Sequence, residues 1–382
     1  MNYYKLCDIC DFQGGSQPPK EEWSLDLKDG YIRMLQIRDF TQSERIVPEY
    51  IKITNSTKTC DEDDILIARY GASLGKILTG LAGAYNVAIM KTIPNTDVLE
   101  KRYLYYYLKS PVFQGFLSNV GSRAAQAGFN KNDLKDLVIP NISKEKQRAV
   151  VDVLERVDSI IVSRQQELMK LDELIKARFV ELFGDPVQNP FQWNTKPLLE
   201  MGYCKNGMNF HTGDSGIEIH CLGVGDFKDY SVIDDTERLP TISLNEMPSE
   251  ENMLQDGDIV FVRSNGNKAL VGRCLVVYPR STPTTYSGFC IRYRLASSDV
   301  DTAYLLRVLK SDSMRKKMVG RGANIQNLNQ QILASLDIPI PPMTMQEQFA
   351  AFVAQVDKSK LLAKIKSLLL NTERGLILNK QA

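Results

Sequence analysis

The sequence has few of the residues on which enzyme active sites and disulfide frameworks depend. Only two histidines occur in 382 residues, and no nucleophile stands with a base in a recognisable catalytic arrangement. The seven cysteines are odd in number and mostly far apart, which favours reduced thiols over disulfides. No run approaches the roughly 18 apolar residues of a membrane span, and the N-terminal residues lack the apolar core of a secretory signal. We therefore expect a cytoplasmic protein without a catalytic centre of its own.

Three motifs that would indicate metal, nucleotide or methyl-transfer chemistry are each incomplete. Cys7 and Cys10 have no second closely spaced Cys or His pair, which a structural zinc site needs, so we expect two buried thiols on an early helix. The segment 71–77 resembles a phosphate loop, but it is one residue short and has Ile77 where Ser or Thr would bind magnesium. Asn189-Pro190-Phe191 lacks the second proline of the catalytic string of base-nitrogen methyltransferases. The sequence therefore predicts no metal and no cofactor in this chain.

The charge of the chain is nearly balanced. Lys and Arg number 47 against 46 Asp and Glu, which gives a formal net charge of +1. This argues against a simple polybasic nucleic-acid binder, because counterion release rewards an excess of cationic side chains. It is compatible with a local basic face that is balanced by acidic residues elsewhere. The length suits two domains, and 43% hydrophobic residues allow each of them to bury a core.

The second half of the chain repeats the first, feature by feature. Each half has a strand-like run ending in Asp-Phe, an acidic turn leading to a β-branched strand and an arginine, a further apolar strand, a Tyr- and Leu-rich helix, an Ile-Pro segment, and a long helix containing glutamine. In this order the matched segments are Met34–Phe40 with Cys221–Phe227, Asp63–Arg69 with Gly257–Arg263, Tyr85–Met90 with Gly288–Tyr293, Tyr103–Ser110 with Tyr304–Ser311, Leu134–Pro140 with Leu333–Pro339, and Gln147 onward with Gln348 onward. Most matched positions lie roughly 190–200 residues apart, which indicates a duplicated domain.

A long helix follows each predicted domain. In the first helix, apolar residues at alternating steps of three and four form a coiled-coil seam that is broken once, by Arg164, and Gly184 ends the helix. The seam residues are Val150, Leu154, Val157, Ile161, Leu168, Leu171 and Ile175. The second helix is expected from about Gln346 to Asn379, with a seam that opens at Phe349, Phe352 and Val356 and continues, after a shift of register, at Leu361, Ile365 and Leu368. The predicted fold is α/β (α+β) domains in tandem, at 1–143 and 186–342, with helical segments at 144–185 and 343–382.

The ends of these helices carry strings that point to a known family. Lys176–Pro186 closes the first helix, and Ile338–Pro342 with Gln346–Gln348 opens the second. The first half keeps Ile139-Pro140 and Lys146-Gln147-Arg148, but it lacks the prolines that follow. Together with the order domain, helix, domain, helix, these strings resemble the DNA-specificity subunits of Type I restriction–modification systems over essentially the whole chain.

The resemblance implies a non-catalytic reader of DNA. In that family each globular domain binds one half of a split, asymmetric target in double-stranded DNA, and the long helices pack as an antiparallel coiled coil with pseudo-two-fold symmetry. The partners are two methyltransferase subunits, which restriction subunits can join, so methyl donor, ATP and magnesium would bind those partners and not this chain. Two alternatives stay open from the residues: a self-sufficient DNA methyltransferase with cryptic motifs, and a coiled-coil scaffold that does not contact DNA.

The loop that follows the repeated arginine is the first candidate for DNA contact. Arginine can bind guanine O6 and N7 together, asparagine can bind adenine, and lysine binds phosphate as a point charge. The candidates are Arg69, Tyr70 and Lys76 in the first half and Arg263, Asn265, Lys268 and Arg273 in the second. The alternative is a solvated hairpin loop with ordinary basic residues.

A polar loop before the Ile-Pro segment is the second candidate. It is rich in arginine and in side-chain amides, the groups that read base edges. The candidates are Arg123, Gln126 and Asn130 in the first half and Arg321, Asn324 and Gln326 in the second. The alternative is a polar turn in which asparagine supplies left-handed backbone. Tyr105–Tyr107 could also stack on bases, but we expect these rings in the core.

Overall fold

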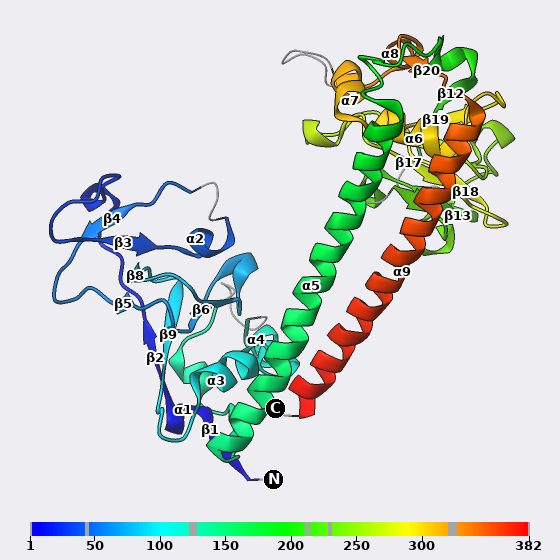
Figure 1. Cartoon of the computed structure of the whole chain (residues 1–382). Coiled ribbons are helices and arrows are strands. Elements are labelled where there is room, and N and C mark those ends of the chain that lie inside the picture. The colour runs from blue at the N-terminus through cyan, green and yellow to red at the C-terminus, as the bar shows by residue number, and fades with distance from the viewer. Residues whose placement is uncertain are drawn as a thin grey trace. The chain divides into compact units, whose positions relative to one another are not determined.

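The computed structural model describes residues 2–42, 46–121, 128–210, 213, 215–227, 231–319 and 327–380. The chain divides into two compact units, the first made of Met1–Gln166 with Ala363–Ala382 and the second of Glu167–Leu362. Each unit therefore contains one predicted domain and a part of each long helix (Figure 1). Within the described ranges, no helix combines the length and the apolar character needed to cross a membrane.

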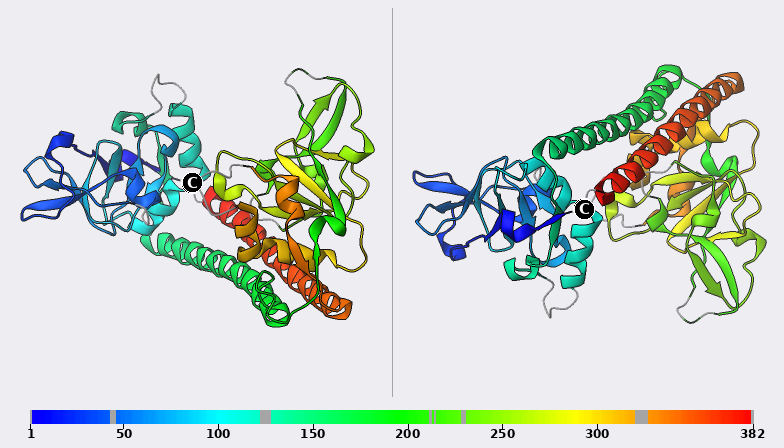
Figure 2. Two further views of the ribbon diagram at one scale, coloured as in Figure 1. Left: turned by 90° about the horizontal axis from the view of Figure 1, so that it is seen from above. Right: turned by 90° about the horizontal axis from the view of Figure 1, so that it is seen from below.

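The first unit contains two four-stranded sheets, in the orders β2-β9-β6-β7 and β4-β3-β8-β5, and the strand pair β1-β10. Only β3 and β8 run parallel among these neighbouring strands. Helix α3 lies beside the first turns of α5 (Figures 1 and 2). The elements are β1 (Tyr3–Lys5), α1 (Leu6–Ile9), β2 (Cys10–Gly14), β3 (Tyr31–Leu35), α2 (Ile37–Thr41), β4 (Tyr50–Lys52), β5 (Thr59–Cys60), β6 (Leu66–Ala68), β7 (Ile77–Leu78), β8 (Gly83–Tyr85), β9 (Ile89–Pro94), α3 (Lys101–Leu108), α4 (Pro111–Gly121), β10 (Val138–Pro140) and α5 (Lys144–Phe183).

The second unit contains a five-stranded sheet, β12-β19-β16-β17-β14, a three-stranded sheet, β15-β13-β18, and the strand pair β11-β20. Its elements are β11 (Thr195–Pro197), β12 (Gly202–Asn206), β13 (Ile217–Leu222), β14 (Val232–Ile233), β15 (Thr241–Leu244), β16 (Asp258–Val262), β17 (Cys274–Val277), β18 (Thr284–Tyr286), β19 (Cys290–Leu295), α6 (Thr302–Lys310), α7 (Asp312–Val319), α8 (Gln330–Ala334), β20 (Asp337–Pro339) and α9 (Met343–Lys380).

The strand orders confirm the duplication. The run β2-β9-β6-β7 corresponds to β12-β19-β16-β17, and β4-β3-β8 corresponds to β15-β13-β18. The parallel neighbours β3 and β8 recur as the parallel neighbours β13 and β18. Strand β5 at one sheet edge and β14 at another have no counterpart in the other unit's strand order. The chain is therefore two mixed helix–sheet domains in tandem, as predicted.

The repeated Asp-Phe pairs lie in helical turns and not at strand ends. Strand β3 ends before Asp39, whose carboxylate accepts the backbone N–H of Gln36 at 2.9 Å. Asp226 does the same for the N–H of Gly223, at 2.8 Å. Each aspartate caps the first helical turn after its strand. The prediction that the strand continues through Asp-Phe is therefore wrong for the last residues of the predicted segment. The predicted strand Tyr85–Met90 is likewise wrong, because it covers the turn between β8 and β9.

A buried aspartate at or just before the start of β6 and β16 explains the repeated acidic turn. Asp64 forms ion pairs with Lys91, at 2.5 Å, and with Lys101, at 3.4 Å. Asp258, which is 1% exposed, forms a two-oxygen pair with Arg294 at 2.8 and 2.7 Å. A buried carboxylate needs such a partner, because water no longer stabilises its charge. The partner is Lys91 of the neighbouring strand β9 in the first unit and Arg294 of β19 in the second.

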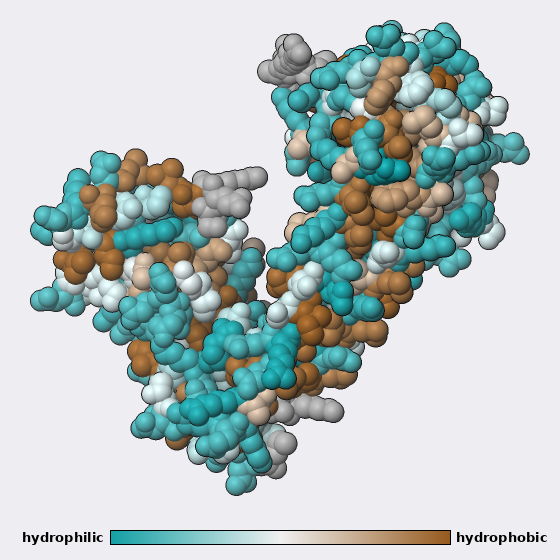
Figure 3. Space-filling view, in the orientation of Figure 1, coloured by the Kyte–Doolittle hydropathy of each residue, from teal (hydrophilic) through white to brown (hydrophobic). Residues whose placement is uncertain are grey.

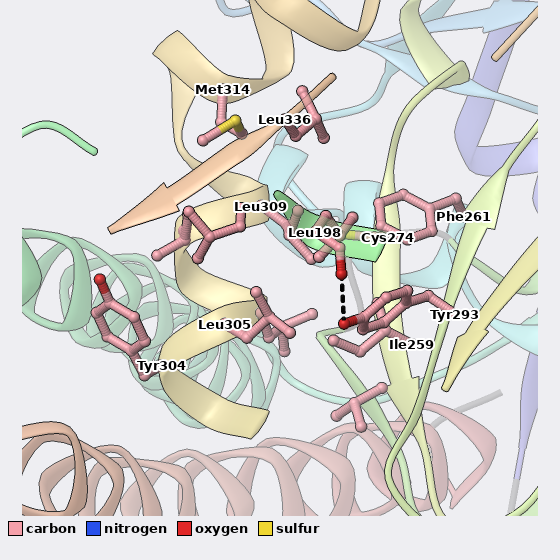
Figure 4. Packing of buried hydrophobic residues seen from close by; sticks show 14 of the residues in the cluster. Leu198, Ile259, Phe261, Cys274, Tyr293, Tyr304, Leu305, Leu309, Met314 and Leu336 are labelled. Carbon is pink, nitrogen blue, oxygen red and sulfur yellow. Dashed lines mark hydrogen bonds between the residues drawn. The ribbon is translucent and has the colours of Figure 1, made fainter. Parts of the chain in front are cut away.

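The core of the second unit lies between its larger sheet and helices α6 and α7. Buried tyrosines keep their hydroxyl groups paired: the Tyr293 hydroxyl donates to the Leu198 carbonyl at 3.0 Å, and the Tyr304 hydroxyl donates to the Pro339 carbonyl at 2.9 Å. Residues of this core labelled in Figure 4 also include Ile259, Phe261, Cys274, Leu305, Leu309, Met314 and Leu336.

The tyrosine run of α3 is largely core, as predicted. Tyr106 and Tyr107 are 2% and 3% exposed. The Tyr106 hydroxyl donates to the Asp158 carboxylate at 3.0 Å, and the Tyr107 hydroxyl donates to the Val138 carbonyl at 2.7 Å. Tyr105 is half-buried against the same cluster. Rings buried in this way cannot stack on nucleic-acid bases.

A buried glutamine fastens the start of α5 to the first unit. Gln147 is 2% exposed. Its Nε2 donates to the carbonyl groups of Val98, at 2.8 Å, and Ile142, at 3.0 Å, while its Oε1 accepts the N–H of Glu100 at 2.9 Å. The side chain thus pairs three backbone groups that would otherwise be buried without partners.

The start of α9 is fastened to the second unit in the same way. Gln346 is fully buried, its Nε2 donates to the carbonyl groups of Asp299 and Pro341 at 3.1 and 2.9 Å, and its Oε1 accepts the N–H of Asp301 at 2.8 Å. Gln348 is exposed. The predicted match of Gln147 with Gln348 is therefore wrong by two positions, since Gln346 makes the equivalent hydrogen bonds.

The positions predicted for the seam of α5 are removed from water. Each of its seven residues is buried or half-buried, and Arg164 is half-buried among them. The helix ends where expected, since Gly184 has a φ of +69° and its N–H donates to the Val180 carbonyl. Glycine adopts this left-handed conformation without a side-chain penalty, so it terminates the helix.

The seam predicted along the second half of α9 is wrong. Leu361, Ile365 and Leu368 are 58%, 45% and 68% exposed. The buried and half-buried positions instead continue in steps of three and four, without a shift of register. They are Phe349, Val353, Val356, Lys360, Ala363, Ser367, Leu370, Arg374 and Ile377. Small and cationic residues thus share this seam with apolar ones, and Leu361, Ile365 and Leu368 lie on the opposite face of the helix.

Within the first unit, the last turns of α9 contact the first turns of α5. The Arg374 Nε lies 2.8 Å from the Asp158 Oδ1, and both side chains are largely removed from water. Leu378 belongs to the same buried cluster as Val151 and Leu154. An ion pair and an apolar contact therefore join the two helices inside this unit.

Within the second unit, the first turns of α9 contact the last turns of α5. The Lys360 Nζ lies 2.5 Å from the Asp172 Oδ1. The Phe349 ring lies 5.5 Å from the Phe179 ring and 5.7 Å from the Phe183 ring, both in edge-to-face geometry. Rising residue numbers along α9 meet falling numbers along α5, so the contact inside this unit is antiparallel.

Candidate nucleic-acid interface

In each unit the two predicted loops meet at one end of the sheet that contains the repeated arginine strand. Tyr70 forms an isolated antiparallel bridge with Gly128, and Ser264 forms the same bridge with Asn327. The loop after the arginine is therefore adjacent to the last residues of the second polar loop. We call this region the loop junction, which comprises residues 69–76, 86–88 and 128–130 in the first unit and 263–273, 287–289 and 327–329 in the second.

Arg69 lies at the centre of the first loop junction. Its Nε donates to the Phe129 carbonyl at 3.1 Å, and its Nη1 donates to the Val87 carbonyl at 3.2 Å. Its own N–H donates to the Ala88 carbonyl at 2.8 Å. A Cβ on Gly14 would lie 3.2 Å from Nη1, so the guanidinium also packs closely on the end of β2. One side chain thereby holds three separate segments of backbone.

Arg263 occupies the equivalent place in the second unit. Its Nη1 donates to the Gly288 carbonyl at 3.2 Å, and its N–H donates to the Phe289 carbonyl at 2.8 Å. Its carbonyl oxygen accepts the N–H of Leu328 at 2.8 Å. The arginine side chain therefore holds the same turn in both units, and the returning segment of the second unit is bound by the main chain of Arg263.

Close backbone approach is built into both junctions. A Cβ on Gly15 would clash with the carbonyl oxygen atoms of Tyr85 and Asn86, and a Cβ on Gly207 would clash with the carbonyl oxygen of Ser287. Only glycine allows the end of β2 or β12 to lie directly against the turn. The geometry around each arginine is consequently fixed by the backbone of the neighbouring strand.

The far end of the first candidate loop is held by a second side chain that the sequence reasoning missed. Gln114 of α4 donates to the Gly75 carbonyl at 2.9 Å. Arg315 of α7 donates to the carbonyl groups of Ala269 and Val271. These two residues sit at equivalent places of the duplication, on helices that follow the Tyr- and Leu-rich helix in each unit. Their equivalent positions in the two halves could have indicated this role, but one residue is a glutamine and the other an arginine, so the sequences do not match there.

Two other predicted residues of the first loop are at the surface. Tyr70 is 41% exposed, and its ring lies against Gly128 and 5.0 Å from the Arg69 guanidinium. Lys76 is exposed and lines a hollow of about 450 Å³ together with Lys109. The exposed ammonium group of Lys76 makes this part of the first unit suitable for a phosphate, whereas that of Lys109 donates to the Tyr105 hydroxyl at 2.8 Å.

The remaining predicted residues that the structure describes take local roles as well. The side chains of Asn130 and Asn265 each accept the N–H two residues further on, both at 2.8 Å. Lys268 is exposed at the start of a 3-10 turn, and Arg273 is half-buried. Short polar residues that bond their own backbone stabilise turns. Contact of these four residues with DNA stays a prediction, as it does for Arg69, Tyr70, Lys76 and Arg263.

Five of the predicted residues lie outside the described parts of the chain. They belong to the second polar loop and are Arg123, Gln126, Arg321, Asn324 and Gln326. Their role in DNA contact also stays a prediction.

Comparison with known families decides the assignment. A family model described as a Type I restriction modification DNA specificity domain matches residues 1–173 and 215–371, which is most of the chain. The chain belongs to this family. Both matched segments contain a loop junction and one end of a long helix, so the duplication seen in the strand orders is the duplication of this domain.

Curated relatives of the chain are specificity subunits. The Type I restriction enzyme MjaVIII specificity subunit of Methanocaldococcus jannaschii is 22% identical in an alignment of 333 positions that covers 82% of this chain and 76% of that protein. The StySPI specificity subunit of Salmonella potsdam is 22% identical over 394 residues, covering 91% of this chain and 82% of that protein.

Solved structures support the fold. A chain from a structure on assembly and conformational transition of the type I R-M system aligns with a TM-score of 0.62 at 17% identity, over all of this chain and 97% of that chain. The Type I restriction–modification S subunit from M. genitalium aligns with a TM-score of 0.51 at 15% identity, over all of this chain and 95% of that chain. The relatives support the specificity-subunit hypothesis and neither of the two alternatives.

Cys7 and Cys10, two free cysteines near the start of the chain, have raised thiol pKa values. Cys10 opens β2 and is buried, and this burial raises its pKa to about 12. Burial also raises the pKa of Cys7, on α1. Metal binding and redox chemistry use the thiolate, which such pKa values disfavour at neutral pH. In the described residues no cluster of three or more ligating side chains surrounds them.

Proposed function

We propose that this chain is the DNA target recognition subunit of a Type I restriction–modification complex, with one unit for each half of a split target. The observation that carries the proposal is the loop junction, which is built twice on equivalent scaffolds in a chain of the specificity-domain family. The two junctions present different side chains, such as Tyr70 and Lys76 in one and Asn265 and Lys268 in the other. Two such surfaces on one chain suit two different half-sites.

The chemistry of the loops suits double-stranded DNA. The exposed lysines Lys76 and Lys268 would contact phosphates and position each unit, while the arginines and amides of the second polar loop would read base edges. A bidentate base contact would contribute about 1–3 kcal/mol of discrimination. A phosphate contact would contribute affinity at every sequence and a part of the salt dependence.

The long helices would set the distance between the half-sites by packing as one antiparallel pair. The ion pairs Asp158–Arg374 and Asp172–Lys360, one inside each unit, support this arrangement. Charged residues in a helix seam fix register, because any slip leaves them unpaired. Helix α5 has 40 residues and so spans roughly 60 Å, which exceeds the roughly 34–36 Å between half-sites one helical turn apart.

The outer face of α9 would bind a methyltransferase subunit. Six large apolar side chains there are 45–68% exposed, and Figure 3 shows hydrophobic residues along the long helices. They fall within roughly 120° of the helix circumference, opposite the seam. They are Leu361, Leu362, Ile365, Leu368, Leu369 and Leu376. An exposed apolar stripe of this kind is characteristic of a binding surface for another protein.

Catalysis would belong to the partners. Methyltransferase subunits would supply the methyl-donor site, and restriction subunits would supply the site for ATP and magnesium. This chain would contribute no cofactor or metal site, in line with the raised pKa values of the Cys7 and Cys10 thiols. Its role is then to place the catalytic subunits on one sequence.

Selection from a randomised DNA pool tests the proposal. The chain, purified in complex with the methyltransferase subunit that binds it, is incubated with random-sequence duplexes, and the bound fraction is sequenced. We expect enrichment of two short blocks around a fixed unspecified spacer, and binding that weakens as salt rises. The proposal would be refuted if no sequence were enriched, or if the methyltransferase alone enriched the same sequences.

A further inference from the structure

We infer that Arg69 and Arg263 are positioning residues that hold the recognition loops, and that neither of them reads a base. The inference rests on the proposed function, because it assigns a task within DNA recognition. It departs from the sequence-based expectation that this repeated arginine contacts guanine.

The hydrogen bonds of Arg69 carry the inference. Reading guanine requires two parallel N–H groups of one guanidinium edge to point at O6 and N7. The Nε–H of Arg69 instead points at the Phe129 carbonyl, and Nη1 points at the Val87 carbonyl. Swinging the guanidinium toward DNA would leave the Phe129 carbonyl, whose hydrogen bond is partly buried, without this donor, while the exposed Val87 carbonyl would be open to water. Such a loss disfavours the swing, because each unpaired polar group costs free energy.

One of the two side-chain hydrogen bonds of Arg69 recurs in the second unit, which supports a shared structural role. Arg263 donates to Gly288 as Arg69 donates to Val87, and both carbonyl groups belong to the turn before β9 or β19. Residues that read bases are expected to differ between two units that bind different half-sites. An arginine with an equivalent backbone partner in both units serves the scaffold that the half-sites share.

The arginine holds the segments on which the recognition loops are mounted. The Arg69 side chain donates to Phe129, near the end of the second polar loop, whereas in the second unit the equivalent Leu328 donates to the main-chain carbonyl of Arg263. Gln114 and Arg315 hold the far end of the first loop in the two units. Each recognition loop is consequently fixed at its base by a donor from the scaffold.

Lysine cannot replace arginine in this task. The guanidinium presents donors in a fixed planar fork, whereas an ammonium group is a single point charge. Lysine keeps the charge that a phosphate contact would need. The Arg→Lys exchange therefore separates positioning from electrostatic contact.

The test uses the full chain in its methyltransferase complex, with Arg69→Lys, Arg69→Ala and the matched pair Arg263→Lys and Arg263→Ala. Methylation is read at base resolution on a plasmid library in which each target position is varied in turn. We expect Arg69→Lys and Arg69→Ala to lower methylation of the target by a similar factor, roughly tenfold. In the Arg69 variants we expect the preference for the correct base to weaken at all positions of one block of the target. In the Arg263 variants we expect the same at all positions of the other block.

The salt dependence of binding gives the second readout. We expect an unchanged slope of binding against salt for both Arg→Lys variants. Relaxed preference at one base, with the other bases still required, would show base reading and overturn the inference. Full activity of Arg69→Lys, with a slope reduced by about one in Arg69→Ala, would show a phosphate contact and overturn it equally.

A variant that leaves the arginine in place guards against an effect of misfolding. Gln114→Leu removes the second support of the first loop without changing charge. The inference predicts loss over the same block as Arg69→Lys, with an unchanged salt slope. An unaffected target in Gln114→Leu would contradict it. If the unchanged chain directs no sequence-specific methylation, the proposed function fails, and this failure is distinct from any outcome in the variants.

Discussion

The buried glutamine at the start of α9 gives the sharpest prediction about stability. Replacing Gln346 by leucine removes three hydrogen bonds and leaves the carbonyl groups of Asp299 and Pro341 and the N–H of Asp301 without this partner. Each bond contributes about 0.5–1.5 kcal/mol net, so Gln346→Leu should lower the free energy of unfolding of the second unit by roughly 2–4 kcal/mol.

Calorimetry of the purified chain measures this loss. For a unit of this size, 1 kcal/mol shifts the unfolding midpoint by about 2–4 °C, so we expect a fall of roughly 5–15 °C. The matched control is Gln348→Leu, two residues further along and exposed, which should change the midpoint little. Equal shifts in the two variants would refute the assignment of Gln346 as the equivalent of Gln147.

Four further predictions address the ion pairs, the helices and the acidic turn. Arg374→Leu leaves the Asp158 carboxylate without its cation and should destabilise the first unit by about 1–3 kcal/mol in urea titration; the double variant with Asp158→Leu should recover much of this, and an additive double variant would contradict the pairing. Asp64 has a pKa held below its usual range, because the ion pair with Lys91 and the Asp61 N–H outweigh burial. A lowered folded-state pKa contributes stability above the unfolded value of about 4 and loses it as pH falls, so Asp64→Asn should flatten the acid limb of stability against pH; an unchanged limb would count against this. Ile365→Glu with Leu368→Glu should abolish co-purification with the methyltransferase subunit, while the neighbouring exposed change Lys366→Glu should not; retained binding would move the partner surface elsewhere. Insertion of one heptad into both long helices, roughly 10 Å, should lengthen the DNA spacer by about three base pairs and keep both half-sites; an unchanged spacer would contradict the role of the helices.

Local patterns predicted the long elements well. The seam of α5 and its end at Gly184 follow from apolar spacing and from one glycine, and both need only neighbours in the sequence. The duplication could also be recognised from the sequence. The aspartates and the glutamine that recur in each half make equivalent hydrogen bonds to the backbone in both units. Features that depend on local hydrogen bonding can therefore be recognised from the sequence.

The second half of α9 could not be predicted in this way. A seam is normally the most apolar stripe of a helix, so the leucines were assigned to it. The structure places Lys360 and Arg374 there instead, because Asp172 and Asp158 face them from α5 within their respective units. Which face of a helix is buried depends on its partner, and that information lies on another part of the chain.

The role of Arg69 was hidden for a related reason. An arginine in a glycine-containing loop has the chemistry of a base reader, and the sequence does not show which backbone carbonyl groups surround it. Those carbonyl groups, of Val87 and Phe129, come from segments well separated from it along the chain. Only the fold brings them to the guanidinium and converts a candidate contact into a support of the loop.

The central claim is that this chain reads DNA and directs methylation to a split target. The most direct measurement is base-resolution methylation mapping of DNA from cells that express the chain with its partner methyltransferase subunit, against cells that express the methyltransferase alone. We predict a new motif of two short defined blocks around a fixed spacer, present only with the chain. Identical methylation in both cell types, with both proteins co-purifying, would contradict the claim.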